Sequence, residues 1–286
     1  MNFVFFGTPK FAAIVLEKLI EANLVPSALV CNPDEPIGRK KILTPPATKQ
    51  LILAKKINIP VFQPKKLSEI KKELENINAD VFIVAAYNKI ISEEIINIPK
   101  FKTIGVHPSL LPKYRGPSPI QSAILNDDKK TGVDLFLIDK EIDHGPVLIS
   151  AESEILESDN YETLENKLAE LGAKLLIENL SGYLSDKIEK KEQDHSKATF
   201  TNKFLTKDGQ VDLEKDSPKL IFNKIRALNP DPGVFSFIKT NSPAGEREKR
   251  VKFLEARLSN NELELLKVQP EGKKPMSFKD FKNGNL

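Results

Sequence analysis

The sequence predicts an α/β fold: a Rossmann-like, mostly parallel sheet followed by a small OB-like β-barrel domain. Three observations predict it. Short apolar runs alternate with helix-periodic segments from residue 2 to residue 149, as in parallel strands joined by helical crossovers. A charged segment without apolar periodicity lies at 185–196. Beyond it, one helix and several short strands are predicted, which is typical of a small barrel.

The chain length and these changes of texture predict two domains. The 286 residues are enough for about two domains of ordinary size. We expect a first domain over residues 1–184, a linker over 185–203 and a second domain over 204–286.

The first domain opens with a predicted strand over 2–6, because this apolar run can be buried on both faces. Thr8 can cap the helix that follows, and Pro9 suits its first turn. Further strands are expected at 27–31, 59–62, 80–86, 103–107, 133–138 and 146–149, and helices at 47–57, 68–77, 92–98 and 120–125. Residues 32–46, rich in proline and charge, are expected to form a long loop.

The remaining elements follow from periodicity. Apolar residues at helical spacing from Tyr161 to Leu175 predict a long helix that closes the first domain. In the second domain, Ser217 and Pro218 begin a helix, and strands are expected at 234–238, 251–258 and 263–268.

Composition excludes several classes of protein. The single cysteine, Cys31, excludes a disulfide scaffold and a cysteine-based zinc site. Because no apolar run reaches the roughly 18 residues of a membrane span, a cytoplasmic protein is expected. Residues 201–286 hold 17 basic and 12 acidic side chains, whereas the rest of the chain holds 26 and 28. This mild basic excess allows contact with a phosphate backbone.

The strongest local motif is the segment 105–116, in which His107 lies at the expected carboxyl end of a strand. Histidine titrates near neutrality, so it suits general acid–base work. A lone histidine is more often structural, but the strand end and the proline-rich loop after it favour a functional role here.

Asp143 lies in a second motif, 139–146, between two expected strands. A carboxylate near His107 would hold its tautomer and raise its basicity. The alternative is an ordinary turn, since Asp-x-Gly is common in turns.

The third motif is the basic run Arg39, Lys40 and Lys41, with Lys49 downstream. These side chains could bind phosphates, although a solvated charge run is the usual meaning of such a stretch. Dinucleotide, P-loop and nucleophile-elbow motifs do not occur in the sequence, and the three histidines do not form a zinc pattern.

Together these segments resemble the methionyl-tRNA formyltransferases. The resemblance runs from Phe3 to Gly284. It is carried by residues 6–9 with 11–12, 33–39, 60–64, 86–87, 107–116 with 120–121, the D-x-x-x-D-x-G frame of Asp139 and Asp143, 226–230 and 269–277.

The resemblance implies transfer of a formyl group from 10-formyltetrahydrofolate to the amino group of methionyl initiator tRNA, for translation initiation. It implies no metal and no covalent enzyme intermediate, and we expect a monomer without membrane contact. His107 and Asp143 are implied to be catalytic. The folate site is implied to include Tyr87, Ser109, Leu110, Leu111 and Pro112, and the tRNA contacts to include Arg39, Lys40, Lys41, Lys273 and Lys274.

Gly105 departs from the family pattern, which has asparagine two positions before the histidine. Residues i and i+2 of a strand share a face, so that asparagine would point beside His107. Asn88 stands where relatives commonly have glycine. We hypothesise that Asn88 reaches across the space vacated at Gly105 and supplies the missing amide to the reaction oxyanion. The alternative is that Asn88 caps a turn.

Two other functions stay open from sequence. A formyltransferase acting on an amino-sugar nucleotide would share the folate site without needing the basic loop. A folate- or tRNA-binding protein that has lost catalysis is the second, and Gly105 is its only support.

Overall fold

The computed structural model describes residues 1–38, 40–240 and 247–285. The chain forms two compact units, each treated by itself below. The first comprises Met1–Pro119, Lys130–Glu154 and Glu165–Thr201, and the second comprises Ile120–Lys129, Ile155–Leu164 and Asn202–Leu286. The first unit therefore contains nearly all of the segment 185–203 that was expected to be a linker.

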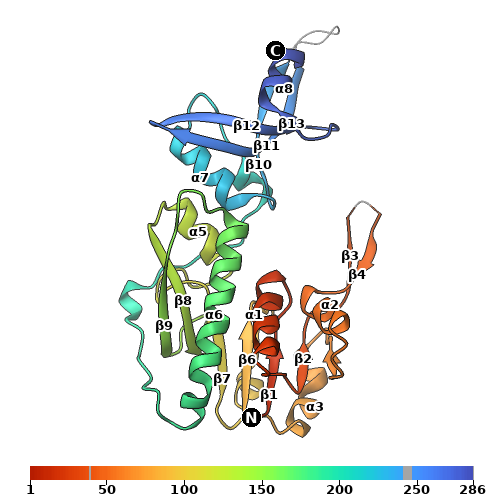
Figure 1. Cartoon of the computed structure of the whole chain (residues 1–286), viewed down its shortest axis with the longest axis vertical. Helices are drawn as coiled ribbons and strands as arrows, with labels where there is room; N and C mark the ends of the chain where they lie inside the picture. The colour runs from red at the N-terminus through yellow and green to blue at the C-terminus, as the bar shows by residue number, and fades with distance from the viewer. Residues whose placement is uncertain (39, 241–246, 286) are drawn as a thin grey trace. The chain divides into compact units, whose positions relative to one another are not determined.

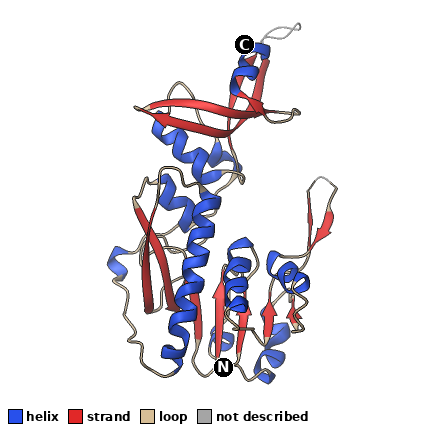
Figure 2. Ribbon diagram, in the orientation of Figure 1, coloured by secondary structure: helices blue, strands red, loops and turns tan. Residues whose placement is uncertain are grey.

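The first unit is built on a seven-stranded sheet of order β5-β2-β1-β6-β7-β8-β9 (Figures 1 and 2). Five strands are parallel: β1 (Phe3–Phe6), β2 (Ala28–Val30), β5 (Val61–Phe62), β6 (Val81–Ala85) and β7 (Thr103–His107). The last two, β8 (Lys130–Leu137) and β9 (Val147–Glu154), are antiparallel. The mostly parallel sheet predicted from the sequence is confirmed.

The helices of this unit match their predicted positions within a few residues. They are α1 (Lys10–Glu21), α2 (Ala47–Ala54), α3 (Lys71–Asn76) after a 3₁₀ turn at Leu67–Ile70, α4 (Glu93–Ile96) and α6 (Tyr161–Leu184), whose first turn belongs to the second unit. All of β1 is buried, and α1 buries Phe11, Ala12, Val15, Leu16 and Leu19. Burial of these helical and strand faces explains why their periodicity predicted them.

The prediction of a long loop over residues 32–46 is wrong in part. This segment holds a two-stranded antiparallel hairpin of β3 (Glu35–Ile37) and β4 (Ile42–Thr44). Its apolar side chains Ile37, Ile42 and Leu43 are all exposed. A hairpin with no buried face lacks the alternation of apolar and polar residues that marks a strand in sequence.

Strand order reverses at β1, because β2 and β5 lie on one side of it and β6 and β7 on the other. Open α/β sheets bind ligands at such a switch point, beyond the carboxyl ends of the strands. The residues that follow those ends are Gly7 and Thr8 after β1, and 86–88 after β6, while His107 ends β7. The fold thus brings several residues of interest to one edge.

The second unit contains an antiparallel sheet of order β10-β11-β12-β13. Its strands are β10 (Val234–Thr240), β11 (Arg247–Ser259), β12 (Glu262–Pro270) and β13 (Met276–Ser277), and its helices are α5 (Pro119–Leu125, apart from its first residue), α7 (Pro218–Leu228) and α8 (Phe278–Asn285). The expected small β domain is confirmed as an antiparallel sheet domain. Helix α8 was not predicted, although its Phe281 is fully buried.

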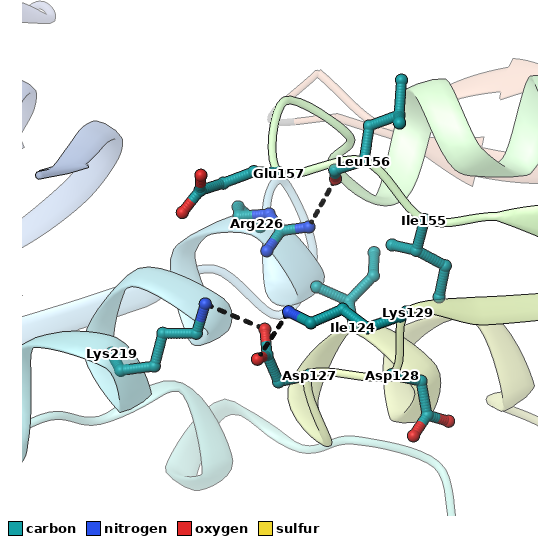
Figure 3. A pocket seen from close by; sticks show the side chains of 9 residues that line it. All are labelled: Ile124, Asp127, Asp128, Lys129, Ile155, Leu156, Glu157, Lys219 and Arg226. Atoms are coloured by element: carbon teal, nitrogen blue, oxygen red, sulfur yellow. Dashed lines mark hydrogen bonds and ion pairs between the residues drawn. The ribbon is translucent and has the colours of Figure 1, made fainter.

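The contacts of Arg226 tie the 226–230 motif to the rest of this unit, and Figure 3 shows its bond to Leu156. It is buried, and its guanidinium donates to the carbonyl oxygens of Asp159, at 2.7 Å, and Leu156, at 3.0 Å. It lines a cavity of about 260 Å³ in which Lys219 and Lys129 each pair with Asp127 at 2.9 Å. Burial lowers the pKa of the Arg226 guanidinium. The motif is thus a structural clamp on the segment 156–159.

Among the described residues, no helix combines the length and the apolar character that crossing a membrane would require.

Candidate active site

His107 lies at the end of β7 and is buried. Its Nε2 is 2.9 Å from the carbonyl oxygen of Tyr114, and its Nδ1 is 3.6 Å from Oδ2 of Asp143. Because a carbonyl only accepts, Nε2 is the donor in the first contact. Nδ1 then faces the carboxylate, so a proton can be held between the ring and Asp143.

Asp143 lies in the turn between β8 and β9, with φ of 48°, in the left-handed region. Its Oδ2 accepts a hydrogen bond from the main-chain nitrogen of Gly116 at 2.7 Å. The structure therefore brings together the two motifs that the sequence singled out, 105–116 and 139–146. The Asp143 side chain is 20% exposed, so it is not sealed in the core as the His107 ring is.

The loop after β7 is held by its own hydrogen bonds. Ser109 is buried, and its hydroxyl donates to the carbonyl oxygen of Lys113 at 2.5 Å. The main-chain nitrogen of Leu111 donates to Oδ2 of Asp134 at 2.7 Å. Leu110, Leu111 and Pro112 are half-buried, so the loop presents a rigid, partly apolar edge beside His107.

Asp134 is a buried carboxyl that sequence analysis missed. It lies opposite His107 in the antiparallel pairing of β7 and β8, and it is only 1% exposed. Burial raises the pKa of Asp134 to about 6. The available signal was a single acidic residue inside the apolar run 133–138, because a carboxyl placed in a buried strand needs a polar partner.

Tyr87 and Asn88 follow β6. The Tyr87 ring is buried against Phe6, with ring centroids 5.7 Å apart, and burial raises the pKa of its hydroxyl to about 12. Asn88 is exposed, and its Oδ1 accepts from Nδ2 of Asn32 at 2.7 Å. The Tyr87 hydroxyl has no hydrogen-bond partner within the described part of the chain.

The space beside Gly105, which was expected to be vacant, is occupied. Gly105 pairs with Phe136 across β7 and β8, and a Cβ at position 105 would collide with the Phe136 ring. That ring also meets the His107 ring edge-on, at 6.3 Å between centroids. An aromatic side chain on the neighbouring strand fills the volume that a side chain at 105 would need.

A third segment, 193–201, packs on this site and was not foreseen. Thr199 accepts a hydrogen bond from the main-chain nitrogen of Tyr114 through its hydroxyl, at 2.8 Å, and from Arg115 through its carbonyl, at 2.8 Å. Gln193 contacts both the Arg115 side chain and the Asp143 main chain. The charged composition that suggested a linker hid these main-chain and amide contacts.

The proposed tRNA contacts lie on exposed turns. Lys40 and Lys41 are exposed in the turn between β3 and β4, and Arg39 lies outside the described residues. Lys273 and Lys274 are exposed between β12 and β13. Lys49 is instead held by Asp34 at 2.9 Å and by Gln63 at 2.7 Å. Hydrogen bonds from Gln63 and Lys49 lower the pKa of Asp34.

Metal chemistry has no evident ligand set: within 1–38, 40–240 and 247–285, no three or more histidine, cysteine, aspartate or glutamate side chains gather as ligands would.

Comparison with known proteins places the chain. A family model described as formyl transferase matches residues 1–180, and one described as formyl transferase, C-terminal domain, matches residues 203–264. The methionyl-tRNA formyltransferase of Sulfurihydrogenibium sp. is 44% identical over 93% of this chain and 83% of its own length. That of Dictyoglomus turgidum is 38% identical over 99% of this chain and 96% of its own length.

Solved structures share the fold at lower identity. An N-formyltransferase from Helicobacter canadensis, in complex with folinic acid and dTDP-3-aminofucose, has a TM-score of 0.63 and 20% identity, covering 90% of this chain and 88% of its own. HypX from Aquifex aeolicus, in complex with tetrahydrofolic acid, has a TM-score of 0.66 and 16% identity, covering 98% of this chain and 46% of its own. On the matches to both of its domains and to full-length relatives, this chain belongs to the formyl transferase family.

Proposed function

We propose that this protein transfers a formyl group from 10-formyltetrahydrofolate to the amino group of methionyl initiator tRNA. The observation that carries the proposal is the pairing of His107 with Asp143 beside the loop 109–116, at the carboxyl ends of the parallel strands. The names of the relatives that align over nearly the whole chain supply the substrate.

The reaction needs a base and a donor. A neutral amine attacks the formyl carbon, and the carbonyl oxygen becomes an oxyanion that must be met by hydrogen-bond donors. Nε2 of His107 donates to the carbonyl oxygen of Tyr114 and Nδ1 faces Asp143, so His107 would donate to the formyl oxygen by giving up the contact with Tyr114. Asp143 can stabilise a charged His107 and, directly or through water, accept the proton that the amine loses. Collapse of the tetrahedral intermediate then breaks the bond between the formyl carbon and N10 of the folate, and N10 takes up a proton as tetrahydrofolate leaves.

A folate co-substrate is supported by the folates described in two proteins of this fold. We place the pterin beside Ser109, Leu110, Leu111 and Pro112, because their loop is fixed and presents apolar surface next to His107. Tyr87 is buried in the core together with its hydroxyl, so a contact with folate would use its main chain.

Asn88 stays our candidate for the donor that replaces the family asparagine. Its Oδ1 is held by Asn32, which leaves its Nδ2 hydrogens as the groups that can donate. Because Phe136 fills the space at Gly105, Asn88 would have to reach the oxyanion from the open edge of the sheet.

The tRNA would meet two exposed basic turns, one carrying Lys40 and Lys41 and the other carrying Lys273 and Lys274. Arg39, next to Lys40 in the sequence, belongs to the same proposed contact. Lysine and arginine side chains that reach phosphates supply sequence-independent affinity. We expect the protein to act in the cytoplasm, where its proposed tRNA substrate is aminoacylated.

The test is a formylation assay with 10-formyltetrahydrofolate and two acceptors, methionyl initiator tRNA and a dTDP-linked amino sugar. We expect formyl-methionyl-tRNA to form and the sugar to remain unmodified. His107→Ala supplies the control for uncatalysed transfer. Formylation of the sugar alone would assign the protein to the other class, and binding of tRNA and folate without any product would identify a binding protein.

A further inference from the structure

Gln193 is a buried carboxamide, 7% exposed, whose polar atoms are all engaged. Its Oε1 accepts from Nε and Nη2 of Arg115, at 3.2 and 2.6 Å. Its Nε2 donates to the carbonyl oxygens of Asp143, at 2.9 Å, and Gly145, at 2.7 Å. One side chain thus joins the loop after β7 to the turn between β8 and β9.

These contacts close a ring around the proposed catalytic carboxylate. Arg115 precedes Gly116 in the chain, and the main-chain nitrogen of Gly116 donates to Oδ2 of Asp143. Gln193 binds the side chain of Arg115 and the main chain of Asp143. Asp143 is therefore held from its carboxylate through one neighbour and from its backbone through the other.

The contacts of Gln193 hold the backbone of Asp143 in an uncommon conformation. Its φ of 48° lies in the left-handed region, which a residue with a Cβ disfavours and which surrounding contacts must maintain. The two carbonyl groups that Gln193 binds belong to Asp143 and Gly145, on either side of His144. Releasing them would free the turn that sets the direction of the carboxylate.

The far side of the ring is also braced. The Arg115 guanidinium is buried, and its Nη2 lies 2.8 Å from Nδ1 of His195. The His195 ring stacks on that of His144, with centroids 4.0 Å apart, and His144 bonds Asp139 at 2.7 Å. The turn 139–145 is thus tied to the segment 193–195 through His144 as well as through the two carbonyl groups that Gln193 binds.

We propose that Gln193 is a positioning residue for formyl transfer: it acts through Asp143, by keeping the carboxylate directed at His107. The proposal rests on the catalytic role proposed for Asp143. Nδ1 of His107 and Oδ2 of Asp143 are 3.6 Å apart, so a small rotation of the turn separates them. Misplacement of a catalytic group by about 1 Å can cost about 10²-fold in rate.

The first experiment compares Gln193→Glu and Gln193→Met in the full-length protein. Glutamate keeps the acceptor facing Arg115 but sets a second acceptor against two carbonyl oxygens. Methionine keeps the length and removes every hydrogen bond. We expect kcat to fall by about 10-fold or more and both KM values to stay within about two-fold, because the lost interaction serves the transition state.

The matched control is Gln50, an exposed glutamine whose Nε2 also donates to a main-chain carbonyl, that of Pro45, at 2.7 Å. Gln50→Glu and Gln50→Met should leave kcat unchanged. The dissociation constant of tetrahydrofolate, measured by calorimetry, should be the same in all four variants and the parent. A Gln193 variant with normal kcat would overturn the proposal.

A double-mutant cycle then separates positioning from a merely structural role. In the Asp143→Asn protein we expect Gln193→Met to slow turnover further by less than about two-fold, because the group it positions is already gone. The same loss in both backgrounds would show that Gln193 does not act through Asp143. If Gln193→Met does not fold, Gln193→Asn, which withdraws the carboxamide by one methylene, carries the same cycle.

The cycle also distinguishes this inference from the proposed function. Full activity of Asp143→Asn alone would remove Asp143 from the mechanism and the proposal with it. A slow Asp143→Asn protein combined with an independent, multiplicative effect of Gln193→Met would leave the mechanism standing and overturn only the positioning role.

Discussion

The two units each bury a cluster of charged and polar side chains, and the clusters differ in what they leave available. In the second unit, each nitrogen atom of the Arg226 guanidinium donates a hydrogen bond: the acceptors are the carbonyl oxygens of Asp159 and Leu156 and Oδ1 of Asn223. In the first unit, His107 and Asp143 face each other across 3.6 Å and the carboxylate is partly exposed.

The difference teaches how a structural cluster is told from a reactive one. A buried cation whose nitrogen atoms each bond a fixed acceptor of the surrounding chain holds that chain in place. A histidine and a carboxylate that lie at the carboxyl edge of a parallel sheet, close but not tightly bonded, can still exchange a proton. Substitutions at the two clusters should therefore separate activity from stability.

The largest effect is expected at His107 and Asp143, the proposed catalytic residues. His107→Ala and Asp143→Asn should each lower kcat by about 10²-fold or more, because each removes charge or proton transfer in the transition state. The melting temperature should remain near that of the parent. Steady-state formylation and thermal unfolding measure the two quantities, and normal turnover in either variant would remove that residue from the mechanism.

Arg226→Met should give the opposite result. It leaves buried acceptors of the segment 156–159 without donors, so we expect a loss of about 2–4 kcal/mol in the free energy of unfolding. The kcat of the molecules that remain folded should stay within about two-fold, since the residue does not touch the reacting atoms. Urea unfolding and active-site titration test this. An undiminished unfolding free energy would show that the clamp contributes little.

Asp134→Asn should change stability with pH. Its folded-state pKa, about 6, lies above the ordinary value of 3.8. The protonated carboxyl therefore stabilises the fold at low pH, and this stability is lost as pH rises through 6. The asparagine at position 134 can still accept the hydrogen bond from the main-chain nitrogen of Leu111. Above about pH 7 the free energy of unfolding of the Asp134→Asn protein should exceed that of the parent by about 2–3 kcal/mol, and below about pH 4 the two should be equal.

The control for that prediction has the reverse sign. Hydrogen bonds from Gln63 and Lys49 lower the pKa of Asp34, so the ionised form stabilises the fold above the ordinary pKa. Asp34→Asn should therefore weaken the protein at neutral pH. Unfolding free energies measured from pH 3 to pH 8 on both variants decide the matter, and equal curves for Asp134→Asn and the parent would contradict the account.

Gly105→Asn should destabilise the protein by about 1–3 kcal/mol, because the new side chain collides with Phe136. Adding Phe136→Ala should cost less stability than the same change in the parent, because it also removes the collision. If Asn88 supplies the missing amide, Asn88→Ala should lower kcat by about 10²-fold, and Gly105→Asn with Phe136→Ala should restore part of it. An Asn88→Ala protein with full activity would leave water or a main-chain nitrogen as the donor.

The smallest expected effect is on tRNA affinity. Replacing Arg39, Lys40 and Lys41 by alanine should raise the KM for tRNA and reduce its salt dependence by up to about three phosphate contacts. The affinity for folate should not change. Alanine at the exposed Lys65, Lys66 and Lys72 is the control. An unchanged salt dependence in the first variant would mean that tRNA binds elsewhere.

Periodicity was enough to predict most of the fold. Strand β1 is buried on both faces and α1 on one, and such burial imposes patterns that can be read directly. The hairpin β3–β4 has exposed apolar residues and a proline, so burial imposed no pattern on it. Helix α8 is short and polar apart from its two phenylalanines.

The site was predictable where motif and strand end coincide, and not where contacts are long-range. His107 and Asp143 could be named from their places in the sequence. Gln193 could not, because its partners lie about 50 and 78 residues away, and carboxamide contacts to main-chain groups leave no composition signal. The clash that a side chain at position 105 would make with Phe136 depends on how β7 and β8 pair. Because β7 is buried throughout, its apolar pattern does not set that register.

The most direct test of the central claim, that His107 and Asp143 act as one catalytic unit, is the rate of a single turnover of methionyl-tRNA formylation in the two single variants and in the double variant. We predict that His107→Ala combined with Asp143→Asn is no slower than the slower single variant, within about three-fold, because either change already disables the pair. Rate losses that multiply in the double variant would contradict the claim and assign the two residues to independent steps.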